Sequence, residues 1–343
     1  MRNDIISPEL YRRLVDDMSQ VYYAARQSYR TDQKLSSFYK TIRSLNVRYR
    51  FRDVENYLSS HVSKGWIIWG NDDVSYYHYL LLQDSQFHVL GTTNFNLEDR
   101  LPNVPFLKFE DSVRMVRDEG YTLLITEQQL TKRVLSFFAW NNMLIVNGHL
   151  VGRCGWQYFD YFQPNKNEVF IDGGALDGRT SLEFVKWCDD RFSKIYLFEP
   201  NTKMYHECKQ TISILPSEKY KFYGIALWNK KCQLLFANEA FSKWDAHVSD
   251  TGDILVNADT IDHLIVDTPV TFIKLDVEGS ELETLEGASE TIKRYHPRMA
   301  ISVYHKKDDL FNIADYVMTL YCGYRFAIRH YHSDAIETIL YAF

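Results

Sequence analysis

The sequence predicts an α/β protein in which N-terminal helices precede a small and then a larger parallel α/β unit. Two observations predict this class. Short apolar runs of strand length alternate with helical stretches in both units, as in parallel sheets whose strands are joined by helices. The larger unit also has a glycine-rich turn directly after its first strand, where open parallel sheets bind ligands. At 343 residues, the chain is long enough for two domains of ordinary size.

The first 62 residues predict amphipathic helices. Apolar residues recur four positions apart in two sets, which are Leu10, Leu14, Met18 and Tyr22, and then Val54, Leu58 and Val62. This spacing puts each set on one face of a helix. Charged residues fill the intervals, so the apolar faces must pack against something. We therefore expect a helical segment at residues 1–62, which is also the candidate contact in a homo-oligomer.

Residues 63–150 predict a small Rossmann-like α/β domain. Its expected strands are 66–69, 87–90, 121–125 and 143–146, and its expected helices are a stretch through Tyr79 and Leu82, 111–118 and 130–140. The turn at 70–74 lies where a phosphate-binding GxGxxG loop would be, but it keeps one of the three glycines. Because those glycines let the backbone approach a pyrophosphate, we interpret this domain as structural or acceptor-recognising.

Residues 151–343 predict the larger α/β unit. Its expected strands are 169–171, 195–198, 221–227, 270–275 and 299–303, and its expected helices are 180–187, 202–214, 280–292 and 308–320. Two last strands, 324–328 and 338–341, flank a polar turn and predict a hairpin.

Composition and charge exclude several functions. The net charge of −6 and the pI of about 6.0 disfavour partners bound through phosphates, such as nucleic acid or an anionic membrane surface. No apolar run approaches the ~20 residues that cross a bilayer, and the start of the chain lacks the apolar core of a signal peptide. Five scattered cysteines favour reduced thiols. We therefore expect a cytoplasmic protein, and its 15% aromatic residues suit a small-molecule or glycan partner.

The strongest functional signal is the run from Asp172 to Gly178, between the first strand and the first helix of the larger unit. Its glycines keep side chains out of a tight turn, so that a cofactor can lie against backbone amides at the helix N-terminus. The spacing of Asp172, Gly174 and Gly178 differs from GxGxxG. We take these three residues and Ala175 as candidate cofactor ligands.

A second signal is Glu199-Pro200-Asn201, at the end of the second strand. An acidic side chain there can accept hydrogen bonds from both hydroxyls of a ribose. These three residues, with Ala226 on the third strand, are further candidate cofactor ligands.

The fourth and fifth strands end in a group of charged residues. Asp276 and Glu278 follow the fourth strand, and Asp276 is expected to point into the same crevice as Gly174 and Glu199. Lys274 shares a face with Asp276, so the two could pair. Glu281 opens the next helix, where a negative charge is favoured for structural reasons. His305 follows the fifth strand and is expected beside Asp276.

Taken together, these motifs resemble the FkbM-type methyltransferase family. The resemblance covers about 155–343, and the segments that carry it are 157–159, 170–178, 198–200, 259–262, 273–281 and 304–305. Five parallel strands followed by a hairpin are the layout of Rossmann-like methyltransferases. Family members usually have Asn or an aromatic residue where this chain has Leu176. The N-terminal α/β unit resembles degenerate Rossmann-like domains fused to bacterial enzymes that modify glycans.

The resemblance implies an enzyme that transfers a methyl group from S-adenosyl-L-methionine to a hydroxyl, often of a sugar or a polyketide-derived compound. We expect the acceptor to be a hydroxyl of a sugar, a glycan or a nucleotide-linked sugar. Such an enzyme must hold the acceptor oxygen in line with the methyl group and remove its proton. We expect His305 to be the base, because an imidazole titrates near neutrality, with Asp276 orienting it or the amino group of the cofactor.

Alternatives to this interpretation concern both the mechanism and the class of function. A divalent cation, magnesium or manganese, could lie between Asp276, Glu278 and His305, but an ordered shell needs more ligands than the sequence supplies. The chain could also be an NAD-dependent enzyme of similar sheet order or a non-catalytic binding or scaffold protein.

Overall fold

The computed structural model describes residues 7–34, 37–38, 41, 58–70, 75, 79, 82, 87–94, 104–125, 145–147, 157–159, 161–237, 247–248, 252, 254–331 and 336–343. The chain divides into two compact units. Unit 1 comprises Met1–Tyr23, Gly155–His330 and Glu337–Phe343, and unit 2 comprises Ala24–Cys154 and Tyr331–Ile336.

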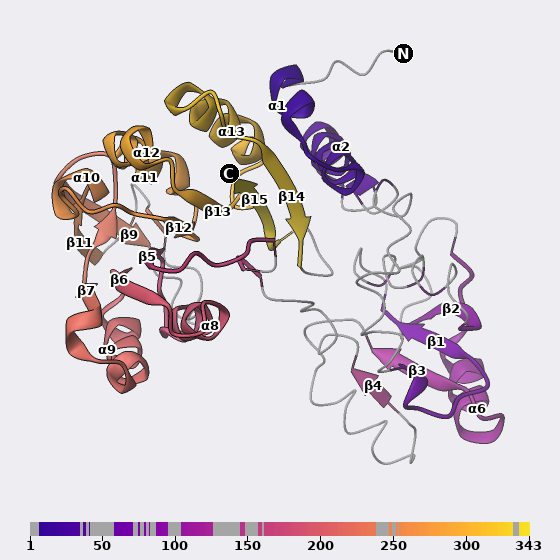
Figure 1. The fold of residues 1–343 in the computed structure, drawn as a ribbon. Coiled ribbons are helices and arrows are strands. Elements are labelled where there is room, and N and C mark those ends of the chain that lie inside the picture. The colour runs from indigo at the N-terminus through magenta and orange to yellow at the C-terminus, as the bar shows by residue number, and fades with distance from the viewer. Residues whose placement is uncertain are drawn as a thin grey trace. The chain divides into compact units, whose positions relative to one another are not determined.

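Unit 1 is built on a seven-stranded sheet in the order β14-β15-β13-β12-β5-β6-β7 (Figure 1). The strands are β5 (Glu168–Gly173), β6 (Phe192–Phe198), β7 (Tyr220–Tyr223), β12 (Phe272–Leu275), β13 (Arg298–Ser302), β14 (Phe326–His330) and β15 (Thr338–Ala342). The five adjacent strands from β13 to β7 are parallel, and β15 runs antiparallel to both of its neighbours. The predicted parallel sheet and C-terminal hairpin are therefore confirmed.

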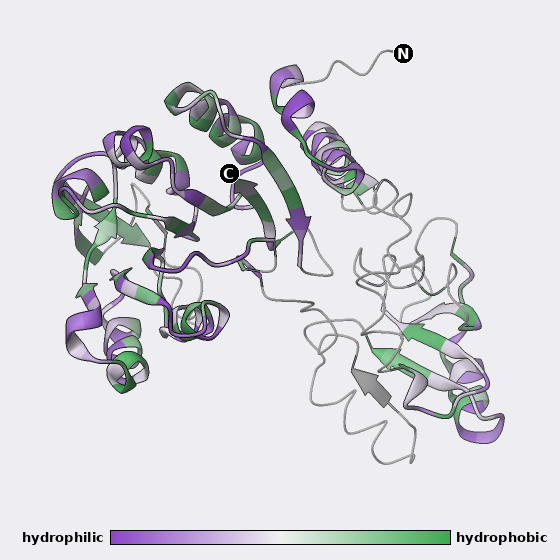
Figure 2. Ribbon diagram, viewed as in Figure 1, coloured by the Kyte–Doolittle hydropathy of each residue, from purple (hydrophilic) through white to green (hydrophobic). Residues whose placement is uncertain are grey.

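Helices connect and cover these strands. They are α8 (Arg179–Trp187), α9 (Thr202–Thr211), α10 (Ile261–Leu264), α11 (Glu281–Glu286), α12 (Ser289–Tyr295) and α13 (Asp309–Leu320), with short 3-10 turns at Ile212–Ile214 and Ser217–Lys219. Figure 2 shows that the helices carry both hydrophobic and hydrophilic residues, as expected for helices that have one face on a sheet. Aromatic rings fill part of the core, where Phe170 stacks on Phe184 with ring centroids 4.2 Å apart.

Two predicted elements of unit 1 are divided in the structure. The strand expected at 221–227 is split into β7 and β8 (Ala226–Leu227), and β8 belongs to a second sheet in the order β10-β9-β11-β8. That sheet also contains β9 (Cys232–Ala237), β10 (His247–Val248) and β11 (Ile254–Asp259), which the sequence analysis missed. The helix expected at 280–292 is interrupted at Gly287, where a Cβ would lie 2.1 Å from the carbonyl oxygen of Trp228. Contacts between distant segments therefore set both divisions.

Unit 2 contains a four-stranded parallel sheet in the order β2-β1-β3-β4. Its elements are β1 (Trp66–Trp69), β2 (Val89–Thr93), α6 (Phe109–Asp118), β3 (Thr122–Ile125) and β4 (Ile145–Asn147). The apolar runs of β1 and β3 are buried along their whole length, because a parallel strand is covered on both faces. The predicted small α/β unit is confirmed in this part of the chain, whereas the helix expected at 130–140 and the turn at 71–74 lie outside the described residues.

The first part of the helical segment expected at 1–62 belongs to unit 1, which includes the chain up to Tyr23. The boundary of that segment stays a prediction. The chain between α1 (Pro8–Arg13) and α2 (Asp17–Asp32) lies along β14, where the amide of Val15 donates to the carbonyl oxygen of Phe326 at 3.0 Å. Arg329 of the same strand donates to both carboxylate oxygens of Asp16, at 3.2 and 2.7 Å. Val62, expected on an apolar helix face, is 98% exposed.

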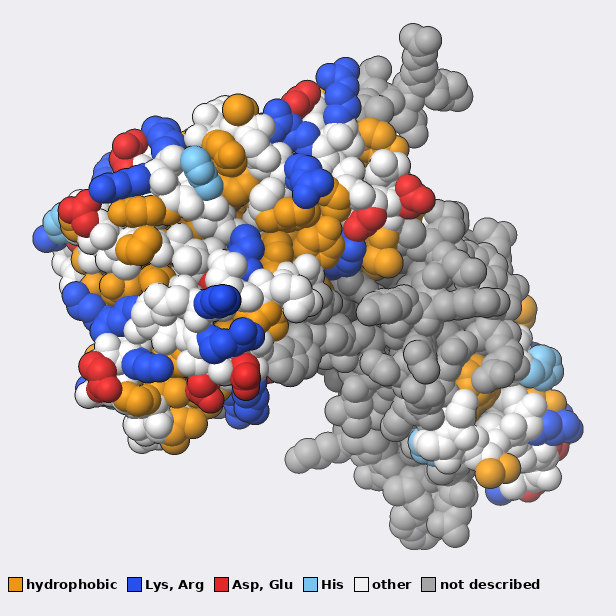
Figure 3. Space-filling view, viewed as in Figure 1, with side chains coloured by type: hydrophobic (Ala, Val, Ile, Leu, Met, Phe, Trp, Pro, Cys, Tyr) orange, Lys and Arg blue, Asp and Glu red, His pale blue; other side chains and the backbone are white. Residues whose placement is uncertain are grey.

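Three further features of the described residues concern the surface charge, membrane-spanning helices and the cysteines. On the face that Figure 3 shows, basic and acidic side chains lie among hydrophobic ones. Within the described ranges, no helix has the length and apolarity that a bilayer crossing requires. Cys188, Cys208, Cys232 and Cys322 are free thiols, and Cys154 lies outside the described residues.

We predict that the Asp16–Arg329 contact stabilises unit 1. The substitution Asp16→Asn removes the charge from a bidentate pair at a half-buried site, so we expect the free energy of unfolding to fall by about 1–3 kcal/mol in urea titrations. Asp17→Asn is the matched control, since Asp17 is exposed, and it should cost well under 1 kcal/mol. Equal losses in the two variants would contradict this assignment.

Candidate active site

The loop after β5 is held against two neighbouring strand ends. The amides of Gly174 and Ala175 both donate to the carbonyl oxygen of Phe198, at 3.1 and 2.9 Å. Gly174 has φ of +75°, and a Cβ on it would lie 1.8 Å from the carbonyl oxygen of Asp276. The glycine is therefore required where the loops after β5 and β12 touch.

Gly178 has a different reason to be glycine. It precedes α8 with φ of +81°, and a Cβ there would lie 2.9 Å from Cys208 Sγ and 3.1 Å from a methyl carbon of Ile212. The residue thus lets α9 pack close to the start of α8. The expected approach of a cofactor to the backbone at this position stays a prediction.

A buried ion pair lies beneath the loop. Lys274 Nζ is 3.1 Å from Asp172 Oδ1 and donates to the carbonyl oxygens of Gly173 and Gly174, at 3.0 and 2.7 Å. Ser181 Oγ donates to the other oxygen of Asp172 at 2.7 Å. Burial alone would lower the pKa of Lys274, but the charges of Asp172 and Asp276 raise it above its ordinary value. Lys274 therefore pairs with Asp172, whereas the sequence had suggested a pair with Asp276.

Glu199 lies at the end of β6 with its carboxylate turned back toward the loop. One oxygen accepts from the amide of Leu176 and the other from the amide of Asn201, both at 2.8 Å. Burial raises the pKa of Glu199 to about 7, although these two hydrogen bonds oppose the shift. Each carboxylate oxygen has a second lone pair, so the group can still accept from a ligand.

Asp276 lies at the end of β12 between two tyrosines. Tyr158 donates to Asp276 Oδ2 at 2.7 Å, and Tyr304 donates to Oδ1 at 3.1 Å. Burial would raise the pKa of Asp276, but the positive charges of Lys274 and His305 outweigh it, so the pKa lies below its ordinary value. Asp276 is therefore an ionised carboxylate at neutral pH.

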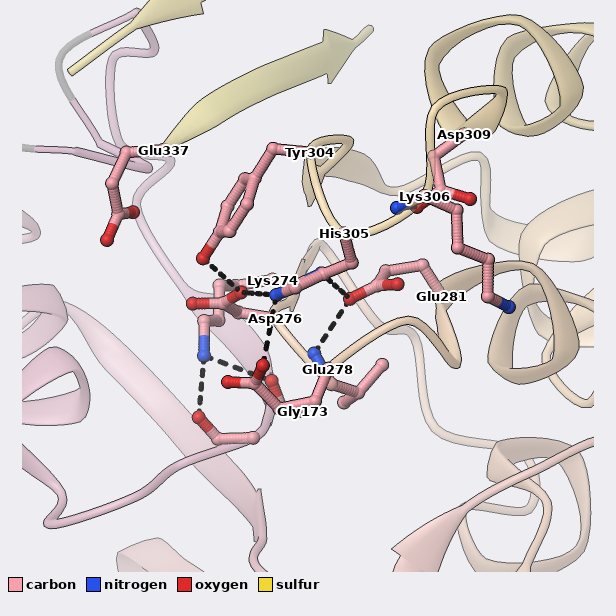
Figure 4. A network of polar contacts seen from close by, with 12 residues as sticks. Gly173, Lys274, Asp276, Glu278, Glu281, Tyr304, His305, Lys306, Asp309 and Glu337 are labelled. Atoms are coloured by element: carbon pink, nitrogen blue, oxygen red, sulfur yellow. Dashed lines mark hydrogen bonds and ion pairs between the residues drawn. The ribbon is translucent and has the colours of Figure 1, made fainter. Parts of the chain in front are cut away.

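His305 lies among carboxylates, as Figure 4 shows. Its Nε2 is 3.3 Å from Glu278 Oε2 and 3.6 Å from Asp276 Oδ1, and its Nδ1 is 3.0 Å from Glu281 Oε1. Neither ring nitrogen has a hydrogen-bond partner of good geometry among the described residues, so these contacts are ion pairs. Burial lowers the pKa of His305, but the surrounding carboxylates raise it to about 11.

The charge on His305 affects its expected role as a base. A histidine with a pKa of about 11 holds its proton at neutral pH, so it cannot accept a second proton from a substrate. Glu278 differs, because burial raises its pKa and its side chain is 39% exposed. It also lies in a strained turn with φ of +52°. Glu278 is therefore the carboxylate of this cluster that an incoming ligand can reach.

One group among the described residues is compact enough to hold a metal ion. It consists of Asp276, Glu281 and His305, whose ligand atoms lie within 4.8 Å of one another. The set expected from the sequence had Glu278 in place of Glu281. An ion here would have to displace the proton from His305.

Some predicted residues have structural tasks, and some important ones were missed. Asn201 Oδ1 caps α9 by accepting from the amides of Lys203 and Met204, and Ala226 is buried in the core of the second sheet. Pro200 lies between Glu199 and this cap. The two tyrosines on Asp276 were missed as site residues: Tyr158 and Tyr304 had entered only through the family resemblance.

Comparisons with known proteins agree with this architecture. The family model of the methyltransferase FkbM domain matches residues 172–326, a little less than half of the chain. The crystal structure of an FkbM methyltransferase from Methylobacillus flagellatus KT is 15% identical, with a TM-score of 0.51 over 95% of this chain and 99% of that one. At that identity the similarity shows a shared fold.

More distant structures cover about half of this chain. A putative rRNA methylase from Clostridium thermocellum is 10% identical, with a TM-score of 0.38 over 58% of this chain and 96% of that one. A putative methyltransferase from Streptococcus mutans, solved in complex with SAH, is 12% identical, with a TM-score of 0.35 over 55% and 93%. No curated protein matches the chain.

We predict that Gly174→Ala separates the loops after β5 and β12. The added methyl group clashes with the Asp276 carbonyl, so we expect a loss of at least about 3 kcal/mol in the free energy of unfolding. Gly120→Ala is the matched control, since Gly120 has φ of +80° and nothing within 4 Å of an added Cβ. It should cost about 1 kcal/mol, from backbone strain alone. Similar losses in both variants would show that strain, and not the clash, matters at Gly174.

Proposed function

We propose that this chain is an S-adenosyl-L-methionine-dependent O-methyltransferase, because residues 172–326 match the methyltransferase FkbM family model and the fold is shared with an FkbM methyltransferase. The observation that carries the proposal is the convergence of Gly174, Glu199 and Asp276 at the carboxyl ends of three adjacent strands. Ligands of open parallel sheets bind at these ends.

Each of these groups suits one part of the cofactor. Glu199 would accept hydrogen bonds from the two ribose hydroxyls, as an acidic residue at this place does in dinucleotide sites. The amino-acid tail would run past Gly174, where the loop has no side chain. Asp276 is ionised and lies beside that loop, so it would bind the positively charged amino group of the tail.

The chemistry needs an in-line acceptor and a place for one proton. The bound cofactor would supply an activated methyl group, whose bond to sulfur would break as its bond to the acceptor oxygen forms, leaving neutral S-adenosylhomocysteine. Glu278 would take the hydroxyl proton, because it is reachable and its raised pKa makes it a better base than Asp276. The His305 imidazolium, 3.3 Å away, would hold the Glu278 carboxylate in position.

The acceptor we propose is a hydroxyl of a sugar, a glycan or a nucleotide-linked sugar, as the family resemblance implies. The segment 238–253 contains Phe241, Trp244 and His247, whose rings would suit a sugar acceptor, and most of it lies outside the described residues. Chemistry at a divalent cation is the alternative mechanism, and turnover that resists a chelator would exclude it. A cytoplasmic location remains part of this proposal.

We predict that S-adenosylhomocysteine stabilises the protein and that NAD does not. A ligand at a hundred times its Kd adds about 2.7 kcal/mol to the free energy of unfolding, which a thermal melt detects. The stabilisation should grow between pH 6 and pH 8, because ribose hydroxyls bind the ionised form of Glu199, whose pKa is about 7. The free protein should show the opposite trend from this group. Because the pKa of Glu199 is raised on folding, its contribution to the free energy of unfolding is complete below the ordinary pKa of 4.5 and is lost as the pH rises through about 7.

Glu199→Gln is the control for this pH dependence. The variant keeps the shape of the side chain but has no proton to lose, so its cofactor stabilisation should be weaker and flat with pH. Stabilisation of the natural protein by NAD but not by S-adenosylhomocysteine would favour the dehydrogenase alternative. Stabilisation by neither would remove the basis for a methyltransferase and favour a scaffold.

We predict that Glu278→Gln lowers turnover at least a hundredfold with any acceptor found by screening, while S-adenosylhomocysteine binds as before. The variant keeps the shape of the site and loses the proton acceptor, and general base catalysis typically raises the rate about 10²–10⁴-fold. Glu290→Gln is the control, since Glu290 is 75% exposed on α12 and should leave turnover unchanged. Unchanged turnover in Glu278→Gln would show that Glu278 is not the base.

A further inference from the structure

Tyr158 lies just before the sheet of unit 1 and has no part in the function proposed so far. Its hydroxyl donates to Asp276 Oδ2 at 2.7 Å, although the two residues are 118 positions apart in the chain. The side chain is 7% exposed, and its ring centroid is 5.3 Å from Lys274 Nζ. Tyr158 therefore covers the buried lysine and touches the carboxylate at the tip of β12.

The backbone of Tyr158 is held in an unfavourable conformation to reach this place. Its φ is +76°, in the left-handed region that a residue with a Cβ seldom adopts. Its amide donates to the hydroxyl of Tyr341 on β15 at 3.2 Å. Strain of this kind persists only where the surroundings over-determine it, and it is concentrated at functional sites.

Tyr158 and Tyr304 restrict Asp276 from two sides. Each hydroxyl donates to a different oxygen of the carboxylate, so the plane of the group is fixed by two partners. Tyr304 follows β13 and lies next to His305, with ring centroids 4.2 Å apart. Tyr158 precedes β5, and its ring centroid lies 5.3 Å from Lys274 Nζ, which donates to the carbonyl oxygen of Gly174.

We propose that Tyr158 is a positioning residue, which orients the Asp276 carboxylate to bind the amino group of the cofactor's amino-acid tail. This inference rests on the proposed function. A hydrogen bond to a charged group typically changes affinity by about tenfold or more. The effect should appear only with ligands that carry the tail, because Tyr158 acts through Asp276 and not on the nucleoside.

Two nucleosides separate this role from a general loosening of the site. S-adenosylhomocysteine carries the amino-acid tail, and 5′-methylthioadenosine has the same adenosine and sulfur without it. In calorimetric titrations, Tyr158→Phe should weaken S-adenosylhomocysteine binding about tenfold and change 5′-methylthioadenosine binding less than twofold. Tyr161→Phe is the matched control, since Tyr161 lies in the same segment and its hydroxyl makes no hydrogen bond with described residues, so both affinities should stay unchanged.

A double-mutant comparison tests whether Tyr158 acts through Asp276. Asp276→Asn should show the same tail-selective loss, and adding Tyr158→Phe to it should change affinity less than twofold further. An equal loss of both nucleosides in Tyr158→Phe, undiminished S-adenosylhomocysteine binding, or loss of the folded state would each overturn the inference. If the natural protein bound neither nucleoside, the proposed function itself would fail.

Discussion

The buried ion pair between Lys274 and Asp172 is the contact on which the site depends. It joins β12 to β5, the two central strands, and the remaining protons of the ammonium group bind the carbonyl oxygens at the start of the glycine loop. A buried charge without a partner is costly, so neither residue tolerates loss of the other. The loop is therefore fixed from below by charge, and from the side by its close contact with the backbone of Asp276.

The positive charge of His305 results from the acidic groups that surround it. Asp276, Glu278 and Glu281 approach one imidazole from different directions, and their charges hold a proton on it that free histidine would lose near neutrality. A positive charge is thereby kept where carboxylates would otherwise repel one another. A histidine that keeps its proton at neutral pH is a poor candidate for a base, and it can instead hold a neighbouring carboxylate in place.

Much of this arrangement could be predicted from the sequence, and the rest depends on contacts between distant segments. Hydrophobic periodicity located nearly all strands of the main sheet, because parallel strands buried on both faces read as apolar runs. The order of motifs placed Gly174, Glu199 and Asp276 at one edge. Periodicity could not reveal that Lys274 would pair with Asp172, or that Tyr158 would reach Asp276, since neither partner is near in the chain. Nor could a residue's identity show that three carboxylates would shift the pKa of His305.

Unit 1 is assembled from three separate stretches of the chain, and its first stretch docks on a strand more than 300 positions later. A ribosome makes the polypeptide from the N-terminus, so this opening piece emerges long before β14 exists. During synthesis its apolar side chains, such as Leu10, have no final place to pack. Such long-range closure is slow and leaves incomplete intermediates exposed to aggregation. A fragment cut at the start of β5 would meet the same problem permanently, because the edge of its sheet would lack the covering segment.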